Sequence, residues 1–173
     1  GMGKTLLSNL ILALIFGGCV DASPYFMGEE KFTSHIISSP LMCIDDTAPA
    51  SDAKWHTRYS SMIKKVAANR TQMYEEKFQK AGQVPWMGRV IVTCNDDPES
   101  IRLLPNVELS LLDKICLFKC ADVEKVFPSA KELDALVREE LPHLLAWLLE
   151  WEIPDHCKGS TRYGVKSYHE NSL

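Results

Sequence analysis

Apolar positions along the chain follow two patterns. Residues 41–46 and 89–95 each contain a short apolar run that ends in polar side chains, which is typical of a strand buried on both faces. Residues 5–16 and 52–68 instead repeat apolar positions every three or four residues, which predicts two helices. The helix over 5–16 has almost no polar side, so we expect it to be buried.

Turn and capping residues divide the rest of the chain. We expect a loop over 21–31, a weak strand or turn over 32–38, a hairpin or extended loop over 69–84, a short helix over 98–103 and a strand over 112–120. Ser129 and Glu132 have the spacing of a capping box and predict a helix start. Pro142 is expected to start a second helical segment.

The length and composition are those of one globular domain. The chain has 173 residues, of which 46% are hydrophobic and 24% charged. Because strands alternate with helices, we predict an α/β fold in which a mostly parallel sheet lies in a three-layer arrangement. The single domain spans 1–173, and residues 121–173 form its helical C-terminal part and tail.

The net charge of −4 argues against a general polyanion binder, but the charge is unevenly distributed. Residues 54–80 carry seven basic side chains against two acids, and residues 121–155 carry nine acids against three bases. The basic stretch is a candidate contact for phosphates. The alternative is a solvated helix face.

The cysteines do not suggest a metal site. They lie at positions 19, 43, 94, 116, 120 and 157 and form no C-x-x-C pair. Cys43 and Cys94 fall inside the apolar strand patterns, so we expect buried free thiols in a reducing cytoplasm. Cys116 and Cys120 lie in a strand-like run, where residues four apart are too distant to share a zinc ion.

The N-terminal segment has two interpretations. Lys4, the apolar run over 6–16, two glycines and Cys19 are similar to a bacterial lipoprotein signal, which would remove residues 1–18. The run is too short to span a membrane. A lipoprotein gives no reason for the polar-tipped strands over 41–46 and 89–95, so we favour a cytoplasmic protein without a membrane partner.

The other interpretation of the N-terminal segment is a phosphate-binding loop. Gly3, Lys4 and Thr5 match the end of a phosphate loop, G-x-x-x-x-G-K-[ST], at the start of a helix. In such a loop the lysine reaches the outer phosphates of ATP and the hydroxyl binds Mg²⁺. Only the last three residues of the motif are present, so we expect the preceding strand and first glycine to be missing from this chain.

Two further polar groups follow the predicted strands. Asp45 would hold Mg²⁺ through water, and Asp46 would orient or deprotonate the attacking water. The amide of Asn95 would donate to the γ-phosphate or to that water. The alternatives are a turn or helix cap at the two aspartates and an Asn-Asp turn at Asn95.

Together these motifs resemble the superfamily 3 helicase module at the C-terminal end of phage and plasmid primase-helicase proteins. Residues 3–5 match the end of its Walker A motif, residues 41–46 match Walker B, and Asn95 matches motif C. Residues 140–147 are similar to the segment that often closes these modules, and 162–168 to the tail of phage-type members.

The resemblance implies an AAA+-like P-loop core that forms a ring, usually a homo-hexamer, hydrolyses ATP with Mg²⁺ between subunits and moves on single-stranded DNA. The DNA-gripping hairpin of the family lies between Walker B and motif C, which places Lys77 or Lys80 at its tip. The alternative for either lysine is an exposed charged turn.

The chain departs from the family pattern at two places. Asp46 stands where many relatives have glutamate, which shortens the reach of the carboxylate. Lys114 stands where relatives tend to have an arginine finger, and Arg102 is the nearest other candidate.

We therefore expect the ATPase core of a phage- or plasmid-type DNA helicase, inactive if its phosphate loop is incomplete. The alternatives are a non-catalytic prophage remnant that binds DNA or a partner, and the lipoprotein.

Overall fold

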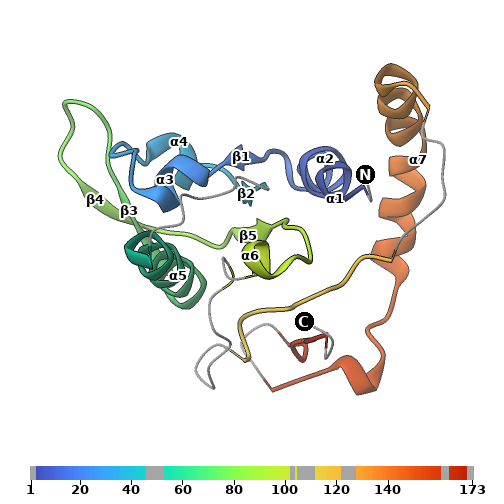
Figure 1. The fold of residues 1–173 in the computed structure, drawn as a ribbon. Coiled ribbons are helices and arrows are strands. Elements are labelled where there is room, and N and C mark those ends of the chain that lie inside the picture. The colour runs from blue at the N-terminus through green and yellow to red at the C-terminus, as the bar shows by residue number, and fades with distance from the viewer. Residues whose placement is uncertain are drawn as a thin grey trace.

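The computed structural model describes residues 3–45, 53–101, 104, 112–121, 128–160 and 164–170. In this part of the chain the fold is mixed α/β, with a small parallel sheet and a long C-terminal helix, α7 (Figure 1). The sheet has the strand order β1-β2-β5, and both strand pairs are parallel. Its strands are β1 (Val20–Asp21), β2 (Leu41–Ile44) and β5 (Arg89–Val92).

The central strand β2 is buried along its whole length. All four of its residues are no more than 4% exposed, as expected for an apolar run covered on both faces. The strands predicted within 41–46 and 89–95 are therefore confirmed, although residue 46 lies outside the described residues. The expected loop over 21–31 is partly wrong, because β1 ends at Asp21 and helix α3 (Ser23–Met27) follows. A two-residue strand is too short to leave a periodic signal.

One face of the sheet packs against the main hydrophobic core. Met42 and Ile44 of β2 belong to this core. Its other buried members come from α3, the short helix α4 (Ser34–Ile37), helix α5 (Ala53–Ala68) and the turn before α3: Ala22, Phe26, Ile36, Ile37, Tyr59, Ile63 and Val66. The α5 residues Tyr59, Ile63 and Val66 follow helical spacing, which confirms the predicted amphipathic helix.

The opposite face carries the N-terminal helical segment. This segment consists of α1 (Lys4–Leu6), a π-helical stretch (Leu7–Leu12) and α2 (Ala13–Phe16). The helix is confirmed, but the expectation that it is buried is wrong. Of its residues, all described, Ser8 alone is buried, and Leu7 and Phe16 are about half exposed. Apolar periodicity indicates a helix but does not indicate how many sides neighbouring elements cover.

An antiparallel hairpin follows α5. It consists of β3 (Thr71–Tyr74) and β4 (Gly82–Pro85), so of the two possibilities for 69–84 the structure forms the hairpin. Figure 1 shows it on the far side of the sheet from α1 and α2. The weak strand or turn expected over 32–38 is instead α4. The short helix predicted from residue 98 is present as α6 (Pro98–Ile101).

The C-terminal helix α7 (Ala130–Glu150) begins at the predicted capping box. The Ser129 hydroxyl accepts from the Glu132 amide, and the Glu132 carboxylate accepts from the Ser129 amide. Pro142 does not start a second helix, because α7 continues through it. A proline inside a helix removes one backbone hydrogen bond, and here the bonds on either side keep the helix continuous.

The strand predicted over 112–120 is wrong. Leu117 makes an isolated bridge to His169, and residues 112–114 form a turn. Apolar alternation alone is therefore not sufficient to predict a strand, which also needs a partner strand. A short 3-10 helix (Asp155–Cys157) is the last helical element of the described chain. Among the described residues, no helix combines the length and apolar character that a membrane span needs.

The cysteines also differ from expectation. Cys19 and Cys43 form a disulfide, with their Cα atoms 6.4 Å apart, so the prediction of free thiols is wrong for this pair. Cys116 and Cys120 are exposed rather than buried. The spatial proximity of Cys19 and Cys43 follows from the pairing of β1 with β2, which the sequence pattern did not reveal.

Candidate functional site at the carboxyl edge of the sheet

Polar side chains gather where the parallel strands end. Asp21 ends β1, Asp45 follows β2, and Thr93 and Asn95 follow β5. Because the strands are parallel, their carboxyl ends meet at one edge of the sheet. In open α/β sheets this edge is the usual place for a ligand.

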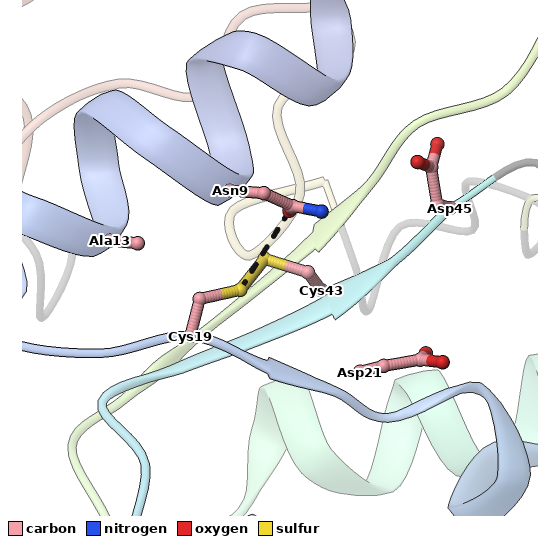
Figure 2. A pocket seen from close by; sticks show the side chains of 6 residues that line it. All are labelled: Asn9, Ala13, Cys19, Asp21, Cys43 and Asp45. Atoms are coloured by element: carbon pink, nitrogen blue, oxygen red, sulfur yellow. Dashed lines mark hydrogen bonds between the residues drawn. A yellow bond between two sulfur atoms is a disulfide. The ribbon is translucent and has the colours of Figure 1, made fainter. Parts of the chain in front are cut away.

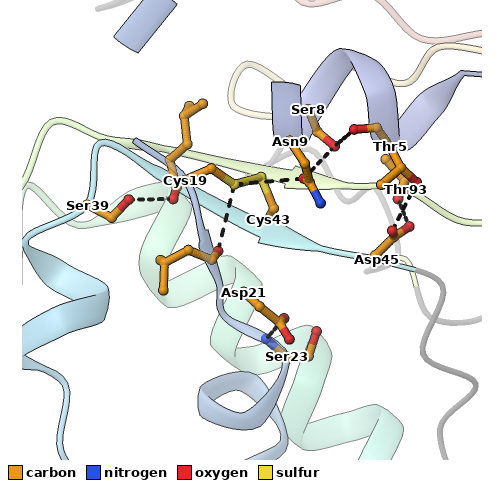
Figure 3. The surroundings of a disulfide bond; sticks show 12 residues. Thr5, Ser8, Asn9, Cys19, Asp21, Ser23, Ser39, Cys43, Asp45 and Thr93 are labelled. Carbon is orange, nitrogen blue, oxygen red and sulfur yellow. Dashed lines mark hydrogen bonds between the residues drawn. A yellow bond between two sulfur atoms is a disulfide. The ribbon is translucent and has the colours of Figure 1, made fainter. Parts of the chain in front are cut away.

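Asp45 links the N-terminal helix to this edge. The Thr5 hydroxyl donates to Asp45 Oδ2 at 2.9 Å, and the Thr93 hydroxyl donates to Asp45 Oδ1 at 2.5 Å. Each carboxylate oxygen thus accepts from a different element, which fixes the direction of the side chain. Figure 3 shows both threonines close together beside the carboxylate of Asp45.

Lys4 reaches the end of the neighbouring strand. Its ammonium group donates to the carbonyl oxygen of Cys94 at 2.5 Å and to Asn95 Oδ1 at 3.2 Å. Lys4 and Asn95 are separated by 91 positions in the sequence, and the fold brings them into direct contact. The edge therefore holds a cation beside the carboxylate that Thr5 contacts.

Gly3 sets the start of the helix. It has a φ of 75°, in the left-handed region where glycine is favoured. Its carbonyl oxygen accepts the first helical hydrogen bond, from the Leu7 amide at 3.0 Å. This conformation turns the chain into the helix so that Lys4 and Thr5, at consecutive positions, face β5 and β2.

A pocket of about 380 Å³ adjoins Asp45 between the helical segment and the sheet (Figure 2). Its lining residues come from the helix and from the first two strands: Asn9, Ala13, Cys19, Asp21, Cys43 and Asp45. The Cys19–Cys43 disulfide lies next to Asn9, whose Oδ1 is 3.8 Å from Cys19 Sγ (Figure 3). Asp21 also accepts from the amide of Ser23, the first residue of α3, at 2.9 Å.

The buried phenol of Tyr59 lies on the α5 side of this edge. Burial raises the pKa of Tyr59 well above its ordinary value of 10.0, and the proximity of Cys94 raises it further. The phenol therefore stays neutral and forms part of the core rather than a source of charge for the site.

The donor set fits a magnesium ion and a phosphate. The Thr5 hydroxyl and the Asp45 carboxylate are hard oxygen ligands 2.9 Å apart, the type that Mg²⁺ prefers. The Lys4 ammonium group is a point charge suited to phosphate oxygens. Asn95 adds an amide that can orient a polar group of the ligand.

Three of the other residues predicted for function, Lys77, Lys80 and Lys114, lie away from this edge. Lys77 and Lys80 are exposed in the loop of the β3–β4 hairpin. Lys114 lies in the 112–114 turn and pairs with Asp113 at 2.5 Å. Asp46 and Arg102 lie outside the described residues.

Sequence reasoning missed Thr93 as a site residue. The available signal was its position, directly after the apolar run of β5 and two residues before Asn95.

Comparison with known proteins gives a family without an assigned activity. A model of a family of unknown function, DUF5906, matches residues 1–106. This range includes the N-terminal helical segment, the whole described parallel sheet and the hairpin. Neither a curated protein nor a solved structure matches the chain. Since the matched range is more than half of the sequence, the chain belongs to the DUF5906 family of unknown function.

Proposed function

We propose that this chain is the ATPase core of a DNA helicase of the kind used in phage and plasmid replication, acting in the bacterial cytoplasm. The observation that carries the proposal is the meeting of Lys4, Thr5, Asp45 and Asn95 at one edge of the parallel sheet. A lysine, a hydroxyl, an acid and an amide are the groups that a P-loop ATPase places around Mg²⁺ and the phosphates of ATP.

We extend the proposal to the fold, as an AAA+-like P-loop core in three layers. Two features support it. The strands are parallel, and helices cover both faces of the sheet: Figure 3 shows the N-terminal helix on one side and α5 on the other. The first helix also begins at Gly-Lys-Thr, where a phosphate loop would present its backbone amides to an anion.

Each residue of the edge has a role in this proposal. When bound, Mg²⁺–ATP would supply the phosphoryl group. Lys4 would neutralise charge on the outer phosphates, and Thr5 and Asp45 would hold the metal. Thr93 keeps Asp45 in a single orientation through its 2.5 Å hydrogen bond. Asn95 orients the γ-phosphate or the attacking water.

Three roles rest on the resemblance to superfamily 3 helicases. Asp46 would activate the attacking water. Lys114 or Arg102 would act as the finger that a subunit inserts into the site of its neighbour in a homo-hexamer. Lys77 and Lys80 would contact the phosphates of single-stranded DNA.

Phosphate release from ATP tests the proposal, measured with and without single-stranded DNA. We would use the longest natural chain that contains these residues. Lys4→Ala should reduce hydrolysis by about a hundredfold or more, because it removes the positive charge that stabilises the transferring phosphoryl group. Lys31→Ala is the matched control, since Lys31 is an exposed lysine outside the site, and should leave the rate unchanged.

Two further measurements, DNA binding and processing of the N-terminus in the cell, separate the alternatives. DNA binding without ATP hydrolysis would favour the non-catalytic remnant over the motor. Cleavage of residues 1–18 in the cell, with a lipid on Cys19, would favour the lipoprotein and contradict the other two.

A further inference from the structure

The β3–β4 hairpin is held firmly at its base. Thr33, which is 5% exposed, donates from its hydroxyl to the Met73 carbonyl at 2.8 Å and accepts from the Glu75 amide at 2.9 Å. The Thr33 amide also donates to the Glu75 carbonyl at 2.9 Å. On the other strand, the Trp86 amide donates to the Arg70 carbonyl at 2.9 Å. The loop between the strands therefore extends from a fixed support.

Phe78 lies at the tip of this loop with an unusual exposure and an unusual backbone conformation. Its side chain is 94% exposed, the highest exposure among the large apolar residues of the described chain. Its φ is 65°, and it is the one described residue other than glycine with a positive φ. Both features oppose folding stability, because a phenyl ring gains by burial and a side chain disfavours the left-handed region. Backbone strain of this kind concentrates at functional positions.

The charges around the ring favour an anionic ligand. Lys77 Nζ lies 5.1 Å from the centroid of the Phe78 ring, and Lys80 is exposed two residues further on. The two acids of the loop are engaged toward the hairpin and the body. The Glu76 carboxylate accepts from the Tyr74 hydroxyl at 3.0 Å, and Glu75 is near enough to Tyr25 to raise the pKa of its phenol, which burial raises more. The tip therefore presents two ammonium groups and one open aromatic face.

An aromatic face with adjacent cations is the arrangement by which proteins hold single strands of nucleic acid. The cations attract the backbone, and the ring stacks on a base regardless of its identity. A protein partner would also accept an exposed ring, but it gives no reason for two lysines beside it. A polyanion with flat bases explains both.

We propose that Phe78 stacks on a base of single-stranded nucleic acid while Lys77 and Lys80 contact the flanking phosphates. This inference rests on the proposed function for the identity of the partner, and it adds the residue that senses bases rather than phosphates. The hairpin tip then distinguishes a stacked, base-bearing strand from any other polyanion.

The test is equilibrium binding of a fluorescent single-stranded oligonucleotide in the absence of ATP. Phe78→Gly removes the ring and suits the positive φ, so the hairpin should fold without strain. It should weaken binding by about fivefold or more, the lower end for loss of one stacked base. Met87→Ala is the matched control, because Met87 is 89% exposed and lies outside the hairpin loop; it should bind as the parent does.

Two additional measurements separate stacking from charge. An oligonucleotide that lacks bases should bind the parent more weakly than the normal strand, and Phe78→Gly should bind the two equally. Lys77→Ala should instead lower the dependence of affinity on salt, since it removes a phosphate contact. Phe78→Trp should retain affinity, and the added tryptophan fluorescence should fall when the normal strand binds.

Several results would overturn the inference. One is equal affinity of Phe78→Gly and the parent for the oligonucleotide, and another is absence of any oligonucleotide binding by the parent. A third is loss of self-association in Phe78→Gly with unchanged DNA binding, which would assign the ring to a protein contact. The binding assay contains no ATP, so its outcome does not depend on whether the chain hydrolyses ATP. Phe78-dependent DNA binding without hydrolysis would support this inference and contradict the motor.

Discussion

Thr5 and Asp45 are 40 positions apart in the sequence, and the hydroxyl of Thr5 donates to the carboxylate of Asp45 at 2.9 Å. This contact joins the first turn of the N-terminal helix to the end of the central strand. The metal-binding role proposed for the carboxyl edge depends on it, because the proposed metal ligands come from both elements.

The hydrogen bond from Thr93 to Asp45 gives the first prediction. Thr93→Val keeps the shape of the side chain and removes its hydroxyl, and it should lower the free energy of unfolding by about 1 kcal/mol. The loss should nearly disappear in an Asp45→Ala background, because the partner is already absent. Urea unfolding of the four proteins measures this coupling.

The control for this cycle is Thr71→Val, an exposed position on β3 that should change stability little. Equal losses from Thr93→Val in both backgrounds would show that the hydroxyl does not act through Asp45.

The core around α3 gives the second prediction. Phe26 is fully buried and packs against the rings of Tyr25 and Tyr59. Phe26→Ala should lower the free energy of unfolding by about 3–5 kcal/mol, because it leaves a cavity that its neighbours cannot fill. Leu149→Ala, at a position 87% exposed, should change it by less than about 0.5 kcal/mol. A small effect at Phe26 in thermal or urea unfolding would contradict this core.

The start of β5 gives the third prediction. A Cβ atom at Gly88 would lie 2.6 Å from the backbone oxygen of Pro40, which also accepts the Arg89 amide at 3.0 Å. Gly88→Ala should therefore displace β5 from β2 and lower the free energy of unfolding by about 1–3 kcal/mol. Gly82→Ala, where a Cβ meets nothing within 4 Å, is the matched control and should be neutral or slightly stabilising. If the two variants unfold alike, the close approach of Gly88 to Pro40 is wrong.

The phenol of Tyr59 gives the fourth prediction, for alkaline pH. Burial raises the pKa of Tyr59 in the folded chain above the ordinary value of 10.0, with a further contribution from Cys94. Above that ordinary value the unfolded chain loses the proton while the folded chain keeps it, so stability falls as pH rises. Below it, Tyr59 is neutral in both states and contributes no pH dependence.

The measurement is the free energy of unfolding from about pH 8 to about pH 11. Tyr59→Phe should lose less stability over this range than the parent, because the titrating group is gone. Parallel pH profiles for the two proteins would place the Tyr59 phenol in contact with solvent.

Much of the carboxyl edge could be predicted from the sequence. The apolar runs that become β2 and β5 end in polar residues, and parallel strands bring such ends together. The contacts of Lys4 with Asn95 and of Thr5 with Asp45 follow from that arrangement and from a helix that begins at Gly3. The capping box at Ser129 also depends only on residues near one another in the sequence, and it marks the start of α7 correctly.

The remaining differences depend on information that is not local. β1 has two residues, so no periodicity could reveal it, and the approach of Cys19 to Cys43 depends on its pairing with β2. Helix α7 continues through Pro142, because the loss of one backbone hydrogen bond does not by itself end a helix of 21 residues. The exposure of Leu7 and Phe16 depends on which elements cover the N-terminal helix, which no pattern within that helix records.

Calorimetric titration with ATP, with and without Mg²⁺, tests the central claim most directly in the longest natural chain that contains these residues. We predict Mg²⁺-dependent binding that Lys4→Ala and Asp45→Asn each weaken by about tenfold or more, and that Lys31→Ala leaves unchanged. Equal affinity in all four proteins, or the same affinity after Mg²⁺ is removed by a chelator, would contradict a magnesium–nucleotide site at this edge.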